Sequence, residues 1–107
     1  MNRYISAFVI GVTAIVMTAY SLGAENLSVK ITDFSYAPEV ITVKVGTTIS
    51  WTNDDNAPHT ITGDDNSWDS GRVKKNETYS HTFDKAGTFE YHCAYHSSMK
   101  GSVIVSP

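Results

Sequence analysis

Residues 85–105, KAGTFEYHCAYHSSMKGSVIV, contain two runs of alternating apolar residues that are joined by a short polar segment. In the first run Phe89, Tyr91 and Cys93 stand two positions apart, and the second run occupies residues 101–105. Apolar residues with a period of two indicate strands with one buried face. We therefore predict two neighbouring strands, with Cys93 pointing into the core at the end of the first.

The same period of two continues through most of the chain. Further alternating apolar runs occur at residues 27–31, 41–45, 49–51 and 79–83. Gly, Pro, Asn and Asp separate these runs, and no stretch has apolar residues at helical spacing. Seven or eight short strands in a chain of this size are typical of a Greek-key β-sandwich. We predict an all-β fold of this type.

The first 24 residues have the layout of a secretory signal. Arg3 supplies a positive charge, the run Ile5–Ala19 is uncharged and mostly apolar, and small residues follow up to Ala24. A positive, an apolar and a small-residue region in this order direct export and end at a cleavage site. We predict a signal peptide at residues 1–24 that is cleaved after Gly23 or Ala24.

An uncleaved membrane anchor remains the alternative, because Tyr4–Ala24 carries no charge and is long enough to span a bilayer. In both cases residues 25–107 amount to one domain outside the cytoplasm, in the periplasm or another exported location. We expect the mature form to have no membrane span and to be a monomer.

Charge and cysteine content narrow the class of function. Acidic residues outnumber basic ones by 11 to 8, whereas nucleic-acid binding requires a basic face, so we exclude nucleic acid as a partner. The acidic pairs Asp54–Asp55 and Asp64–Asp65 are interpreted as solvated turn residues, since a calcium loop would end in a bidentate Glu. The single cysteine excludes an internal disulfide. An unpaired cysteine in an exported protein points to a function such as metal binding.

Four side chains with soft or borderline donor atoms are candidate metal ligands. Cys93, His96 and Met99 stand three positions apart, and His59 lies far upstream in NAPHTIT, at the predicted start of another strand. A turn with ligands at this spacing can curl around one ion before the strand at residues 101–105 begins. One thiolate, two imidazoles and a thioether suit copper, whereas zinc sites seldom use a thioether. The combination predicts one copper ion bound by these four residues.

Structural roles remain the alternative for each candidate taken singly. A buried cysteine is usually a small apolar side chain, and a methionine often fills the core. The joint pattern of the four residues outweighs these alternatives. For His81 and His92 the structural interpretation is favoured, because both lie on strands away from the candidate ligands and His92 faces opposite to Cys93.

Residues 85–105, together with VKVGTTISWTNDDNAPHTI at residues 43–61, resemble the small blue copper proteins, the cupredoxins. Within that family the resemblance is greatest to the amicyanin type, with plastocyanin and pseudoazurin further away, and it extends over Val29–Val105. It implies a type 1 copper ion bound by His59, Cys93, His96 and Met99. It also implies a soluble one-electron carrier, not an enzyme, that meets a redox donor and acceptor transiently at the edge of His96.

Two other classes of function remain open. A copper-delivery or copper-storage module of the same fold would use similar ligands but would exchange its ion readily. A metal-free sandwich would act as an adhesion or interaction domain.

The chain departs from the family pattern beside two of the ligands. The family usually has Asn after the first histidine and Thr or Ser after the cysteine, with their side chains hydrogen-bonded to each other. Here these positions hold Thr60 and Ala94, so we expect that tie to be absent and the Thr60 backbone N–H to be left as a donor to the Cys93 sulfur. Prolines between the ligands, which amicyanin-like loops carry, are also missing.

Overall fold

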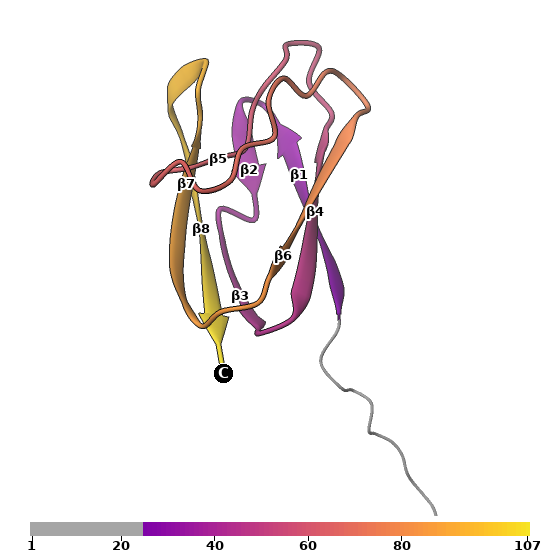
Figure 1. The fold of residues 1–107 in the computed structure, drawn as a ribbon. Helices are drawn as coiled ribbons and strands as arrows, with labels where there is room; N and C mark the ends of the chain where they lie inside the picture. Colours follow the sequence, from indigo (N-terminus) through magenta and orange to yellow (C-terminus); the bar gives the residue numbers. More distant parts are fainter. Residues whose placement is uncertain (1–24) are drawn as a thin grey trace, which may run out of the picture.

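The computed structural model describes residues 25–107, which form a β-sandwich of eight strands without a helix (Figure 1). The predicted all-β sandwich with seven or eight strands is therefore confirmed. The predicted signal peptide and its cleavage site lie outside the described residues and stay predictions. Within residues 25–107 there is no helix of the length and hydrophobicity needed to cross a membrane.

Each of the two sheets contains four strands. The first sheet has the order β2-β1-β4-β6, with bounds β1 Asn26–Thr32, β2 Ser35–Ala37, β4 Thr47–Asn53 and β6 Thr78–Phe83. The second has the order β3-β8-β7-β5, with bounds β3 Val40–Lys44, β5 Thr62–Gly63, β7 Gly87–Cys93 and β8 His96–Ser106. Both sheets are mixed, because β1 pairs with β4 and β3 pairs with β8 in parallel while the other pairs are antiparallel.

Large aromatic residues fill the space between the sheets. Trp51 on β4 is fully buried, and its indole N–H donates to the Tyr91 hydroxyl of the opposite sheet at 3.1 Å. Tyr91 lies across β8 at Gly101, where a Cβ atom would overlap the phenol ring. This close approach requires glycine at position 101. The alternation of the sequence thus brings Tyr91 and Cys93 inward on β7, as predicted.

The candidate ligands gather at one end of the sandwich. In Figure 1 the β7–β8 turn, the β1–β2 turn and the segment after β4 all lie at the end of the molecule opposite to the C-terminus. His59 lies in the segment after β4, where it forms an isolated bridge with Val73 and does not begin a strand. Residues more than thirty positions apart are therefore neighbours at this end.

The structure corrects the predicted position of His96 and Met99. They do not lie on a turn before the last strand, because β8 already begins at His96, which pairs with Cys93. The pairing shifts register between His92 and Cys93, and only two residues form the turn. The alternation that would have indicated this early start of the strand is interrupted by the serines at 97 and 98.

Candidate metal centre

Three ligand atoms from two parts of the chain come together at this end of the sandwich. The Cys93 sulfur lies 3.8 Å from Nδ1 of His59 and 3.6 Å from Nδ1 of His96. A nitrogen and a sulfur bonded to one ion at about 2.0 and 2.3 Å, with about 120° between the bonds, lie about 3.7 Å apart. The spacing of the three atoms therefore fits a single metal ion between them.

Burial differs among the four predicted ligands. His59 and Cys93 are buried, with 0% and 1% exposure, and Met99 on β8 is 2% exposed. His96 is half-buried. Within residues 25–107, His59, Cys93 and His96 are the one group of three His, Cys, Asp or Glu side chains close enough to bind an ion. The site thus has a single ligand edge near solvent, that of His96.

Asp55 fixes the orientation of the buried histidine. Its carboxylate accepts a hydrogen bond from Nε2 of His59 at 2.9 Å. With the proton on Nε2, the lone pair of Nδ1 faces Cys93, which is the form of imidazole that binds a metal. Hydrogen bonds of this kind are a recurrent way of orienting metal-binding histidines.

The same carboxylate also holds the β1–β2 turn. It accepts the backbone N–H groups of Asp33 and Phe34 at 2.8 and 2.9 Å. Burial tends to raise the pKa of Asp55, but the hydrogen bonds from the Phe34 N–H, from His59 and from the Asp33 N–H outweigh it and lower the pKa. The interpretation of Asp55 as a solvated turn residue is therefore wrong. From the sequence alone nothing shows that a turn some twenty residues earlier folds onto this carboxylate.

Phe34 is a further residue of the site that the sequence did not indicate. Asp33 and Phe34 both have positive φ angles, 53° and 56°, which cost free energy for side chains other than glycine. The Phe34 ring packs edge-on against the rings of His59 and His96, with centroids 5.0 and 4.8 Å away, yet it is 48% exposed. This strained turn places an aromatic ring between solvent and two candidate ligands.

Thr60 is hydrogen-bonded both to the sulfur of Cys93 and to the backbone of the residue that follows it. Its backbone N–H donates to the Cys93 sulfur at 3.4 Å, as predicted. The expected loss of the family's side-chain tie is compensated, because the Thr60 hydroxyl oxygen accepts the backbone N–H of Ala94 at 2.8 Å. A side chain–backbone bond thus joins the two segments where the family usually has a side chain–side chain bond.

The other two histidines stay outside the cluster, as predicted. His92 faces away from Cys93, and its ring nitrogen Nδ1 lies 2.6 Å from the carboxylate of Asp64. His81 is half-buried and stacks on Trp68 with ring centroids 4.9 Å apart. Burial lowers the pKa of His81, an effect that the nearby Asp84 partly opposes.

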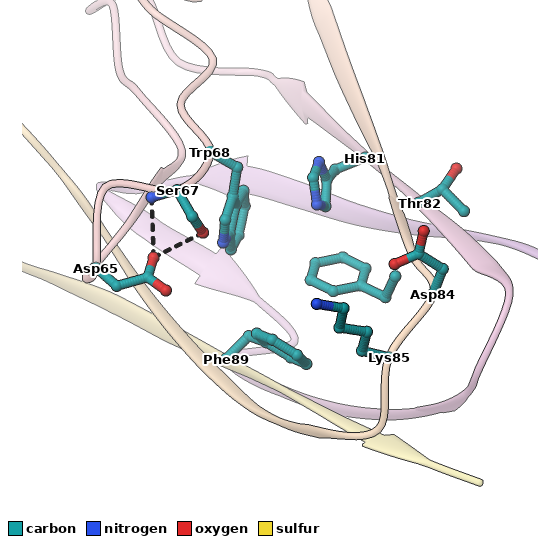
Figure 2. Close-up of a pocket in the computed structure, with 9 residues that line it drawn as sticks. Asp65, Ser67, Trp68, His81, Thr82, Asp84, Lys85 and Phe89 are labelled. Atoms are coloured by element: carbon teal, nitrogen blue, oxygen red, sulfur yellow. Dashed lines mark hydrogen bonds between the residues drawn. The ribbon is translucent and has the colours of Figure 1, made fainter.

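A cavity of about 330 Å³ lies next to His81 and is shown in Figure 2. Trp68, Phe83 and Phe89 form its apolar walls, and His81, Asp65 and four other polar or charged residues complete the lining. In the turn beside it, the carboxylate of Asp65 accepts hydrogen bonds from the backbone and the side chain of Ser67. None of the four candidate ligands lines this cavity, so the metal centre is a separate feature of the molecule.

Fold and donor set together define a copper-binding β-sandwich, because two histidines and one cysteine with a nearby methionine form the donor set of blue copper sites. The chain belongs to the cupredoxin family: the model of the cupredoxin-like domain matches residues 5–105. Copper is accordingly the cofactor that this site fits.

The chain is also similar to individual amicyanins and plastocyanins. Amicyanin from Paracoccus denitrificans is 35% identical over 72% of this chain, which spans 63% of that relative, less than two thirds of its length. Plastocyanin from Scenedesmus fuscus is 34% identical over 65% of this chain and 85% of its own. The solved structure of a Cu(I) amicyanin variant superposes with a TM-score of 0.71 at 33% identity, over 75% of this chain and 81% of that one.

Proposed function

We propose that this protein is a soluble type 1 copper protein that carries single electrons by cycling between Cu(I) and Cu(II). The observation that supports this most directly is the group of His59 Nδ1, Cys93 Sγ and His96 Nδ1, all within 4.8 Å of one another, at the end of a cupredoxin sandwich. In this proposal residues 25–107 are the mature, exported domain, and residues 1–24 are removed as a signal peptide.

The four ligands would have unequal roles. His59, Cys93 and His96 would form the strong ligand plane, and the buried thioether of Met99 would be a weaker axial donor. Bound copper supplies a one-electron couple. The chain contributes ligands on a rigid framework, since Cys93 and His96 are paired across β7 and β8 and His59 is oriented by Asp55. Such a framework limits rearrangement when the oxidation state changes.

A carrier is favoured over an enzyme because four protein donors leave no open position for a substrate, unlike the three-ligand sites of catalytic metals. Amicyanin and plastocyanin among the relatives support the same choice. Copper delivery or storage is the alternative function, and it would require that the ion leave the site readily.

Redox partners would meet the protein at the His96 edge. Two half-exposed aromatic residues flank it, Phe34 at 4.8 Å and Tyr95 at 6.5 Å between ring centroids. The guanidinium group of Arg72 lies over the Tyr95 ring at 5.9 Å from its centroid. Small, partly apolar surfaces of this kind suit brief electron-transfer encounters.

The proposal is tested with the copper-loaded protein over repeated cycles of reduction and oxidation in the presence of a Cu(I) chelator. A carrier retains its copper and its visible absorption through each cycle. A delivery module loses the ion to the chelator in the reduced state, and that result would replace the proposed function with the alternative.

The docking surface is tested by electron self-exchange and by reaction with a small redox protein. Phe34→Ala is expected to slow the reaction between proteins, because the apolar contact next to His96 is lost. Val40→Ala is the matched control, since Val40 is similarly exposed, at 55%, but lies on β3. Equal rates for the two variants would remove Phe34 from the docking surface.

A further inference from the structure

A row of hydrogen bonds leads from the residue after Cys93 to the surface of the molecule. The Thr60 hydroxyl oxygen accepts the Ala94 N–H at 2.8 Å and lies 2.9 Å from the hydroxyl oxygen of Thr62. The Thr62 hydroxyl in turn lies 2.9 Å from a carboxylate oxygen of Asp69. Thr60 and Thr62 are buried, with 3% and 6% exposure, whereas Asp69 is exposed.

The chemistry of the groups gives this row a single direction. An ionised carboxylate only accepts, so Thr62 donates its hydroxyl proton to Asp69. The Thr62 oxygen then accepts the proton of Thr60, and the Thr60 oxygen is left to accept from the Ala94 N–H. The donor and the acceptor of each hydroxyl group are therefore fixed. The negative charge of Asp69 polarises the hydrogen bonds of the whole row.

The row reaches the cysteine through Thr60 and Ala94. Ala94 follows Cys93 directly, and Thr60 donates its own backbone N–H to that sulfur at 3.4 Å. A hydrogen bond to a thiolate withdraws charge from the sulfur and is a recognised determinant of metal reduction potentials. Whatever holds Thr60 in place therefore acts on the sulfur.

We propose that Thr62 and Asp69 are positioning residues of the metal centre, which hold Thr60 so that its N–H donates to Cys93. This inference rests on the proposed copper function for its effect on the potential, but the hydrogen bonds themselves concern the metal-free chain as well. Neither residue belongs to the four candidate ligands or contacts them in the hydrogen-bond row; both act through Thr60.

The segment that carries Asp69 is anchored firmly enough for this role. Trp68, the preceding residue, is 8% exposed and packs so closely on Gly63 that a Cβ atom there would overlap the indole. Figure 2 shows the Trp68 side chain beside the ring of His81. Asp69 also forms an isolated bridge with Thr62. The carboxylate thus has a fixed position relative to the Thr62 hydroxyl.

The first test cuts the row in its middle. Thr62→Val replaces the hydroxyl with a methyl group of similar size, and Thr62→Ser keeps the hydroxyl. Thr52→Val is the control, because the Thr52 hydroxyl makes a bond of the same length, 2.9 Å, to Thr78 at an exposed position within the first sheet, away from the metal centre. In the metal-free protein we expect the amide of Ala94 to exchange its hydrogen about fivefold faster in Thr62→Val, the equivalent of one hydrogen bond of about 1 kcal/mol.

The copper-loaded variants supply a readout that a purely structural role would not move. Weakening the N–H···S bond leaves more charge on the sulfur, which disfavours Cu(I), so the reduction potential should fall in Thr62→Val. It should return in Thr62→Ser and stay unchanged in Thr52→Val. An unchanged potential in a folded Thr62→Val protein would overturn the role of Thr62.

A second pair of variants works at the exposed end and leaves the core untouched. Asp69→Ala removes the acceptor, whereas Asp69→Asn keeps an acceptor oxygen. Faster exchange of the Ala94 amide in Asp69→Ala only is the expected result, and equal exchange in both would contradict the proposal. If the wild-type protein showed no reversible copper couple, the proposed function would fail, while these exchange rates would still decide on the hydrogen-bond row.

Discussion

The Asp55 carboxylate and the His59 imidazole lie 2.9 Å apart, and this contact links two features of the site. One is the orientation of a fully buried candidate ligand. The other is the Asp33–Phe34 turn, whose two backbone N–H groups the same carboxylate accepts. The position of Phe34 against His96 and the orientation of His59 therefore depend on one side chain.

Asp55→Asn is expected to destabilise the metal-free protein by about 1–2 kcal/mol, because both carboxylate oxygens accept and an amide keeps only one acceptor. Denaturant unfolding measures this. Asp54→Asn is the control, since within residues 25–107 the hydrogen bonds of Asp54 involve its backbone groups only. Since the pKa of Asp55 is lowered in the folded state, its contribution is present above its ordinary pKa of 3.8 and is lost as the pH falls below that value. A variant with wild-type stability at neutral pH would contradict the linking role.

Copper should stabilise the fold, because the site is assembled from segments that are neighbours only in the native state. Binding to the folded chain alone contributes about 4 kcal/mol at a thousandfold excess over Kd. The melting temperatures of the metal-free and copper-loaded protein measure the gain, with Cys93→Ser as the control that lacks the thiolate. Equal melting temperatures in the wild type would count against a pre-formed site.

Met99→Leu should leave an intensely coloured site with a raised reduction potential. Leucine keeps an apolar, water-excluding side chain at a position that is 2% exposed, but it removes the thioether donor. Voltammetry and absorption of the copper-loaded variant test this. Loss of copper from the variant would show that Met99 is a primary ligand.

His81 should make the stability of the metal-free protein depend on pH. Burial beside Trp68 lowers its pKa in the folded state, so the unfolded chain takes up a proton first as the pH falls through about 6.5. The stability that neutral His81 contributes is present above that pH and is lost progressively below it. Unfolding curves between about pH 7.5 and 5.5 should show a smaller decline in His81→Gln. Identical declines in the variant and the wild type would refute this.

The sequence was sufficient for the architecture and for the choice of candidate ligands. Alternation placed Cys93 inward at the end of its strand, and the three-residue spacing selected His96 and Met99. The early start of β8 was not predictable, because Ser97 and Ser98 interrupt the apolar period and lie where the register with β7 shifts. The pairs on either side of this shift, Cys93 with His96 and His92 with Lys100, depend on residues of β7.

The residues around the ligands could not be predicted for a different physical reason. Asp55 and Phe34 act through contacts between segments that are more than twenty positions apart. A short acidic pair before a histidine is typical of a solvated turn, and a phenylalanine with positive φ has no sequence signal. The Asp55 contacts follow from the pairing of β1 with β4 within one sheet, and the contact of Phe34 with His96 follows from the packing of that sheet on the other.

The visible absorption of the copper(II)-loaded protein, measured beside that of Cys93→Ser, tests the central claim most directly. Charge transfer from a thiolate to copper(II) should give the wild type an intense visible band, because the Cys93 sulfur lies 3.8 and 3.6 Å from the two histidine nitrogens and would share one ion with them. Cys93→Ser should lose that band even where copper still binds. A weak band in the wild type, or an intense one in Cys93→Ser, would contradict the assignment of a type 1 copper site.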